Sequence, residues 1–209
     1  MAVDTYCGHR RRVDRDICEA ILNRMEETNI KLFDRPHSGR KHTAPRPNQR
    51  GAIGLRGSEF WGPIEDIFDR LEKQIYPYEN PIEHIYINIF NTTNPDKPSY
   101  MSLHVDGHSA INNPESLYTE DYITYISSIL IDKSEDFEGG EIVIAGDHFR
   151  DVPEDIRPED PKNLGFRLKV ERQNEIGDTV QWNCFTYHGI AEVKSGKRIA
   201  MVVHKRAKR

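Results

Sequence analysis

Two stretches near the N-terminus place apolar residues at the spacing of a helix. Within 14–25 they recur every three or four positions, and a second, longer stripe runs through 58–75. Ser58 is a residue type that caps helices, and Glu59 follows it, so we expect the second helix to begin there. Each stripe predicts an amphipathic helix that covers another apolar surface.

After Pro77 the pattern changes to short runs of β-branched and aromatic residues separated by turn residues. Eight such runs predict strands at 82–90, 101–106, 122–131, 139–145, 166–170, 179–183, 187–193 and 198–204. In the last run the residues that face each side of the strand are apolar, so this strand is expected to be buried on both faces. The pattern favours a mainly β fold with α: a double-stranded β-helix, or jelly roll, of about eight strands, with the larger sheet covered by the two N-terminal helices.

The length of 209 residues fits one domain. We expect 1–80 to form a helical support, 82–204 the jelly-roll core and 205–209 a basic tail. No stretch approaches the roughly 18 apolar residues of a membrane helix, and the N-terminus lacks the apolar run of a signal peptide. We therefore expect a cytoplasmic protein with no membrane partner. Three cysteines without CxxC spacing exclude a disulfide framework.

Charge is divided unevenly along a chain whose formal net charge is −5. The segment 35–58 holds no acid and six basic residues, and it is predicted to be a basic loop. An acidic, proline-containing stretch at 147–162 is predicted to leave the strands as an excursion. Basic runs are most often solvated surface, but the basic residues of 35–56 could also contact nucleic acid.

Candidate metal ligands lie on the predicted strands. His104 and Asp106 are two positions apart, so both side chains would leave the same face of a strand. His188 lies on a later strand. Two histidines and one carboxylate form the facial triad of non-haem iron oxygenases, which leaves three positions open on the metal. Arg198 opens the final strand, and its guanidinium could hold the far carboxylate of a dicarboxylic co-substrate.

The stretches LHVDG, DFEGGEIVI, IGDTVQW and YHGIAEVKSGKRIAMV occur in the order found in one family. Over about 82–204 the chain resembles the 2-oxoglutarate and Fe(II)-dependent oxygenases, particularly their prolyl 4-hydroxylase-like branch. The resemblance implies that His104, Asp106 and His188 bind iron and that Arg198 binds the C5 carboxylate of 2-oxoglutarate. It also implies O₂ as a reactant and, as is usual in this branch, ascorbate as a further cofactor.

Several glycines and an aromatic residue in these stretches have simpler interpretations. Gly139 and Gly140 are expected to form an ordinary turn before a strand, and so is Gly177. Trp182 is expected to belong to the core.

Other histidines compete with this assignment. His108 continues the alternation of His104 and Asp106, but Gly107 favours an end of the strand before it. His84 and His148 are interpreted as surface or structural residues, whereas His204 shares a face with Arg198 and would lie on an inner wall or in the core.

A second, weaker likeness is to the AlkB-type nucleic-acid dealkylases. In that group an asparagine and a tyrosine on the first strand contact 2-oxoglutarate; here these positions hold Asn88 and Phe90. Ser128 is a further candidate contact. The second arginine of that group is replaced by His204, which disfavours a dealkylase. Tyr100 stands one position earlier than the tyrosine of many prolyl hydroxylases.

The leading hypothesis is a dioxygenase that hydroxylates an aliphatic C–H bond, with a peptidyl prolyl or lysyl residue as the first choice of substrate. In the family, 2-oxoglutarate is decarboxylated to succinate and CO₂ in the same reaction. The alternatives are an AlkB-like oxidative demethylase or hydroxylase of nucleic acid and a non-catalytic jelly-roll module that binds metal.

Overall fold

The computed structural model describes most of the predicted strands and both predicted helices. The residues described are 11–28, 32–33, 49–92, 99–104, 106, 121–145, 168–184 and 186–208. The predicted acidic excursion at 147–162, His108 and His148 lie outside them, as do residues 35–48 of the predicted basic loop.

The first helix, α1 (Arg15–Thr28), confirms the prediction and continues three residues beyond Met25. Ile17 and Ile21 on its apolar stripe are fully buried. In α2 (Glu65–Gln74), Phe68 and Leu71 are buried in the same way.

The prediction that the second helix begins at Ser58 is wrong. A 3-10 turn, η1 (Gly62–Ile64), precedes α2, and a proline lies at its start. Trp61 is fully buried, and its indole Nε1 donates a hydrogen bond to the carbonyl oxygen of Gly54 at 3.3 Å. This contact holds the chain in a turn before the helix, which the spacing of apolar residues alone could not indicate.

All eight predicted strands are present. They are β4 (Ile82–Asn91), β5 (Ser99–His104), β6 (Tyr122–Lys133), β8 (Ile142–Ala145), β9 (Leu168–Glu171), β10 (Asp178–Asn183), β11 (Tyr187–Ser195) and β12 (Lys197–Lys208). Three short strands were not predicted: β1 (Arg11–Arg12), β2 (Leu32–Phe33) and β3 (Gln49–Ala52). The strand predicted at 139–145 is divided, and its first residue belongs to the two-residue strand β7 (Glu138–Gly139). Strand β3 falls in the predicted basic loop, where it pairs with β4.

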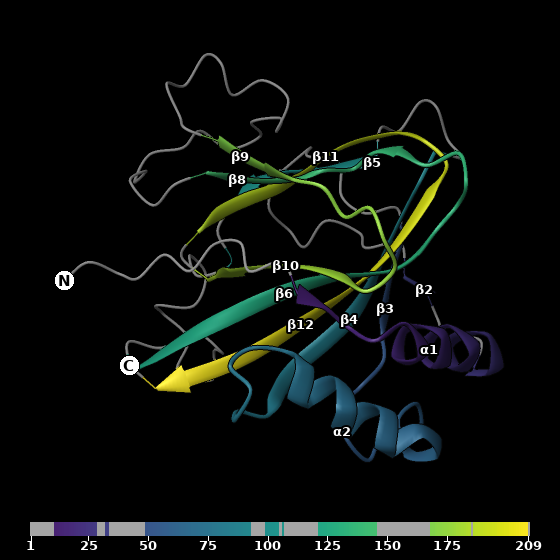
Figure 1. Cartoon of the computed structure of the whole chain (residues 1–209), viewed down its shortest axis with the longest axis vertical. Helices are drawn as coiled ribbons and strands as arrows, with labels where there is room; N and C mark the ends of the chain where they lie inside the picture. Colours follow the sequence, from purple (N-terminus) through teal and green to yellow (C-terminus); the bar gives the residue numbers. More distant parts are fainter. Residues whose placement is uncertain are drawn as a thin grey trace.

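The strands form two antiparallel sheets. The larger has the order β1-β10-β6-β12-β4-β3-β2, and the smaller has the order β5-β11-β8-β9, with β7 also paired to β11. Figure 1 shows three layers: α1 and α2 lie below the larger sheet, and the smaller sheet lies on its other side. This is the jelly roll with a helix-covered larger sheet that the sequence predicts.

Each layer boundary holds its own apolar core. Between the helices and the larger sheet lie side chains such as Ile87 of β4 and Met201 of β12. Between the two sheets lie others, including Ile144 of β8 and Val202 of β12. Met201 and Val202 are neighbours that enter different cores, so β12 is buried on both faces as predicted.

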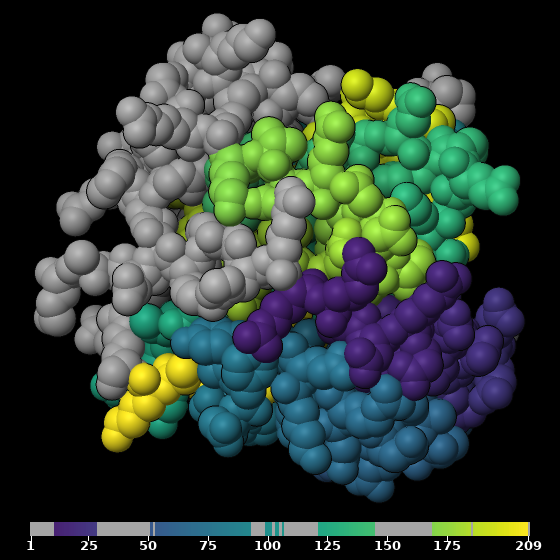
Figure 2. Space-filling model, in the orientation of Figure 1, coloured from purple at the N-terminus to yellow at the C-terminus, as the bar shows by residue number. Residues whose placement is uncertain are grey.

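The segment before α1 is fastened to the loop that precedes β10. Figure 2 shows the purple N-terminal residues between the yellow-green residues of β9 and β10 and the blue residues of α2. The amide of Val13 donates to the carbonyl oxygen of Gly177 at 2.9 Å. Gly177 has φ +89°, and a Cβ there would lie 2.1 Å from the Val13 carbonyl oxygen, so a glycine is needed at this turn.

The predicted basic tail is not a separate segment through most of its length, because β12 continues to Lys208. Lys205 is fully buried and points to the helix layer, where its Nζ donates to the carbonyl oxygens of Glu72 (2.7 Å) and Ile75 (2.9 Å). These are carbonyls at the C-terminal end of α2, which lack partners within the helix. The lysine therefore fastens α2 to the larger sheet.

Neither helix in the described part of the chain has the length and apolar character that crossing a lipid bilayer requires.

Candidate metal centre

Two neighbouring strands of the smaller sheet bring the predicted metal ligands together. His188 of β11 pairs directly with His104 of β5 in the sheet register. Asp106 was predicted to lie on the same strand as His104, but β5 ends at His104 and Asp106 follows the strand end. The carboxylate nevertheless turns toward both imidazole rings.

The three side chains converge on one point. Nε2 of His104 lies 3.5 Å from Oδ1 of Asp106, and Nε2 of His188 lies 3.4 Å from its Oδ2. One ligand atom from each residue can be chosen so that all three lie within 4.8 Å of one another. These separations match three ligands on one face of a single ion, since metal bonds to nitrogen and oxygen are about 2 Å long.

His188 is held rigidly. Its side chain is 2% exposed, its Nδ1 lies 3.0 Å from the Thr186 carbonyl oxygen, and the Trp182 ring centroid lies 4.4 Å from that of the imidazole. A hydrogen bond from Nδ1–H to a carbonyl leaves Nε2 with a free lone pair for a metal. Burial and the nearby His104 lower the pKa of His188 to about 4, so the ring is neutral at neutral pH.

Asp106 is ionised beside the two rings. Burial alone would raise the pKa of its carboxyl group, but His188 and a hydrogen bond from His104 outweigh that effect, and the pKa lies below its usual range. The site thus offers two imidazoles and one carboxylate, the donor set that non-haem iron proteins use.

Arg198 of β12 is the second predicted feature, and it is a buried cation. It is 2% exposed, and its burial lowers its pKa to about 10. Among the described residues it makes no ion pair: Nη2 donates to Ser128 Oγ at 3.3 Å and to Gln173 Oε1, and the guanidinium stacks 5.4 Å from the Phe90 ring centroid. A buried guanidinium without a carboxylate favours the binding of an anion.

Asn88 and Ser128 lie on the same wall as Arg198. Both are buried, at 5% and 2% exposure, and strands β4 and β6 place them on either side of β12. Ser128 contacts the guanidinium directly. The Asn88 Oδ1 atom is buried and has no hydrogen-bond partner in the described part of the chain. A buried polar atom without a partner on the inner wall fits a bound polar ligand.

Two residues near these groups were not predicted to have a role. Trp182 was expected to be a core residue, and it is; its ring also packs against that of His188. Gln173, between β9 and β10, accepts a hydrogen bond from Arg198. The sequence around it, ERQNE, has no periodicity that could have indicated a buried side chain.

The remaining described histidines, His204 and His84, differ in their burial. His204 is buried on the inner face of β12, with the rings of His84 and Tyr86 at 5.4 and 5.7 Å. It therefore lies on the inner wall, one of the two predicted positions. His84 is exposed at the surface, as predicted.

The residues present fit an Fe(II) ion together with 2-oxoglutarate. His104, Asp106 and His188 would hold the ion, and Arg198 with Ser128 would hold a carboxylate within the same barrel. Asn88 would contact the same ligand.

Comparison with protein-family models and with the curated proteins found no match. Solved structures do match. The epimerase SnoN in complex with Fe³⁺, α-ketoglutarate and nogalamycin RO is 12% identical, with 93% of this chain and 77% of SnoN covered and a TM-score of 0.58. A Pseudomonas putida prolyl 4-hydroxylase is 9% identical, with 96% and 92% covered and a TM-score of 0.51.

A viral collagen prolyl hydroxylase from Paramecium bursaria Chlorella virus-1, in complex with 2-oxoglutarate, is 13% identical, with 95% of each chain covered and a TM-score of 0.52. At these levels of identity the comparisons establish the fold. The chain has the double-stranded β-helix fold of the 2-oxoglutarate and Fe(II)-dependent oxygenases, with a His-Asp-His cluster on its smaller sheet.

Proposed function

We propose that the protein is an Fe(II)- and 2-oxoglutarate-dependent oxygenase that hydroxylates an aliphatic C–H bond. One observation carries this proposal: a three-ligand metal face and a buried guanidinium without a carboxylate partner among the described residues occur within the same barrel. The first fits iron and the second fits the distal carboxylate of the co-substrate.

The protein's own groups bind and orient in this reaction. When bound, iron and 2-oxoglutarate supply the chemistry: O₂ delivers one oxygen atom to the substrate and one to the co-substrate, which leaves as succinate and CO₂. His188 and Asp106 offer unprotonated ligand atoms at neutral pH. Arg198 and Trp182 are each only 2% exposed, so these two side chains are shielded from bulk water.

A peptidyl prolyl or lysyl residue is the substrate class we propose to test first. Its support is the SGKR sequence before the last strand, which resembles the hydroxylase branch, together with a shared fold with two prolyl hydroxylases. SnoN has the same fold and is an epimerase, so fold alone does not choose a substrate.

Nucleic acid has less support as a substrate. The hypothesis depends on the basic residues of 35–56, and Arg56 is the member whose side chain the structure describes. Its guanidinium pairs with Asp69 and with Glu72 at 3.2 Å, so its charge is already balanced on the surface of α2. A phosphate would have to displace these carboxylates.

The proposal is tested by assaying succinate formed from 2-oxoglutarate in the presence of Fe(II) and O₂, with proline-containing peptides and an oligonucleotide as alternative substrates. We expect wild-type protein to form succinate and His104→Ala to form none. Arg198→Ala should recover turnover only when 2-oxoglutarate is raised by about a hundredfold, since charge-assisted carboxylate contacts contribute about 1.5–3 kcal/mol each.

Succinate formation by folded His104→Ala at the wild-type rate would contradict the metal assignment. Succinate that rises only with the oligonucleotide would exclude the peptide and select the alternative substrate class. The amounts of succinate and hydroxylated product should be equal in a coupled reaction.

A further inference from the structure

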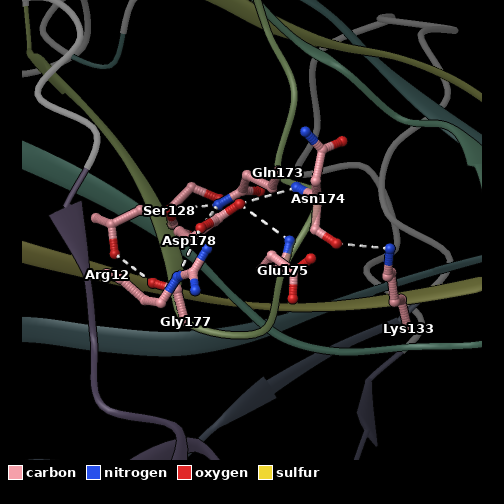
Figure 3. Close-up of polar contacts among 9 residues, drawn as sticks. Arg12, Ser128, Lys133, Gln173, Asn174, Glu175, Gly177 and Asp178 are labelled. Carbon is pink, nitrogen blue, oxygen red and sulfur yellow. Dashed lines mark hydrogen bonds and ion pairs between the residues drawn. The ribbon is translucent and has the colours of Figure 1, made fainter.

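Gln173 occupies a buried position behind Arg198, in the loop between β9 and β10. It is 8% exposed. Its Nε2 donates to the carbonyl oxygen of Ser128 at 2.7 Å and to that of Asp178 at 2.6 Å, and its Oε1 accepts a hydrogen bond from Arg198. Figure 3 shows the side chain extending from its loop to Ser128 and Asp178.

These bonds fix which way the amide faces. An amide nitrogen carries two hydrogens, and both are used by main-chain carbonyls. A flipped amide would point its NH₂ group at the guanidinium and its oxygen at two carbonyl oxygens, and no hydrogen bond could form in either place. The carbonyl oxygen of Gln173 is therefore committed to Arg198.

The same geometry leaves one side of Arg198 open. The bonds to Gln173 and Ser128 both come from Nη2. In the described part of the chain, Nη1 and Nε have no hydrogen-bond partner. Nη1 therefore keeps both of its hydrogens for an oxygen of a carboxylate. A neutral acceptor at Gln173 orients the guanidinium and leaves its charge uncompensated.

We propose that Gln173 is a positioning residue for 2-oxoglutarate: it holds Nη2 of Arg198 and so locks the guanidinium with Nη1 positioned to receive the distal carboxylate. This inference rests on the proposed function. It also requires a neutral side chain at this position, because a carboxylate would pair with Arg198 and take the place of the co-substrate.

The loop has other anchors, which makes Gln173 open to substitution. Lys133 Nζ donates to the Asn174 carbonyl oxygen at 2.7 Å, and the amides of Asn174 and Glu175 donate to Asp178 Oδ2 at 2.9 and 3.0 Å. All three contacts use main-chain atoms of the loop, as Figure 3 shows. They persist when the side chain of Gln173 is changed.

The test is an anaerobic titration of Fe(II)-loaded protein with each of two acids. Binding is monitored through the visible charge-transfer band of the iron chelate. The acids are 2-oxoglutarate and 2-oxopentanoate, which has the same chain length and a methyl group in place of the distal carboxylate. Gln173→Leu removes the acceptor, and Gln173→Glu keeps its shape but adds a charge. Asn174→Ala, next in the loop and exposed, is the matched control.

We expect both Gln173 variants to lose at least about tenfold of the preference for 2-oxoglutarate over 2-oxopentanoate, because a charge-assisted contact is misdirected. The Kd for 2-oxopentanoate and the Kd for Fe(II) should stay at wild-type values, as should all Kd values of Asn174→Ala. A purely structural role would weaken both acids alike.

An unchanged preference in folded Gln173→Leu and Gln173→Glu would overturn this inference and leave the proposed function intact. Wild-type protein that binds Fe(II) but forms a chelate with neither acid would overturn the proposed function itself. The two failures are thus distinguishable in the same titration.

Discussion

The two histidines of the metal centre differ in how firmly the protein holds them. His188 is buried between Trp182 and the Thr186 carbonyl, whereas the His104 side chain is 36% exposed at the end of β5. Burial lowers the pKa of His188 to about 4, so protons do not compete for its nitrogen at neutral pH. His188 is the preorganised ligand, and His104 faces the open side.

The packing of Trp182 on His188 predicts a spectroscopic signal. The chain has two tryptophans, and Trp61 lies in the other core, between the helices and the larger sheet. A paramagnetic ion quenches indole fluorescence at short range. Fe(II) should therefore strongly quench Trp61→Phe, which keeps only Trp182, and should quench Trp182→Phe much less. Equal quenching of the two variants would mean that iron binds elsewhere.

Among single residues, the sequence predicted those whose side-chain direction is set by the alternation of positions along a strand. His104, Asp106 and His188 came from spacing and family resemblance, and Asn88 and Ser128 share the inner wall with Arg198 because alternate positions face the same way. Gln173 could not be predicted, because its burial depends on a loop meeting a strand from another part of the chain.

Among the elements, β12 connects the three layers. Its inner face carries Arg198 and its outer face carries Lys205, which binds the last carbonyls of α2. Burial lowers the pKa of Lys205 from the ordinary lysine value of 10.5 to about 8. Between these two values the unfolded chain binds a proton that the folded chain does not, so the contribution of Lys205 to stability rises with pH.

We therefore predict that the free energy of unfolding of wild type minus that of Lys205→Met increases by about 2 kcal/mol from about pH 7 to about pH 10. Urea denaturation at a series of pH values measures it, and the subtraction removes the other titrating groups. A difference that stays constant or falls as pH rises would contradict the buried position of the lysine.

The turn at β7 gives a prediction about glycine. Gly139 has φ +82°, and a Cβ there would lie 2.1 Å from the Glu192 carbonyl oxygen of β11. Gly57 has φ +77° but open space around it. Alanine at Gly57 should lower the free energy of unfolding by about 1–2 kcal/mol, because only the backbone conformation is unfavourable there. Alanine at Gly139 should lower the free energy of unfolding by roughly 1–3 kcal/mol more than this, because β7 and β11 must move apart to make room for the Cβ atom.

Urea denaturation of the two glycine variants provides the comparison. Equal losses of stability would show that the close approach of β7 to β11 does not exist in solution.

Strands were easier to predict than their surroundings. The eight predicted strands follow alternation and turn residues, and β12 was recognised by its two apolar faces. The two-residue strands β1 and β2 are too short to carry a pattern. The start of α2 was misplaced because Trp61 packs into the core from a turn, while its apolar character continues the helical stripe.

In the whole molecule, the proposed site depends on the two sheets facing each other. The metal ligands belong to the smaller sheet, at β5 and β11, and Arg198, Ser128 and Asn88 belong to the larger one. The helices bury the outer face of the larger sheet and so leave its inner face for the ligand (Figure 1). Sequence could indicate both halves, but only the folded chain shows that they share one barrel.

The most direct test of this account is a crystal structure of the protein with Mn(II), as an oxygen-stable substitute for iron, and 2-oxoglutarate, with the metal located by anomalous scattering. The account predicts one anomalous peak bound by His104, Asp106 and His188, and a distal carboxylate of 2-oxoglutarate that accepts a hydrogen bond from Nη1 of Arg198. A metal at another position, or a co-substrate that leaves Arg198 without a carboxylate, would contradict it.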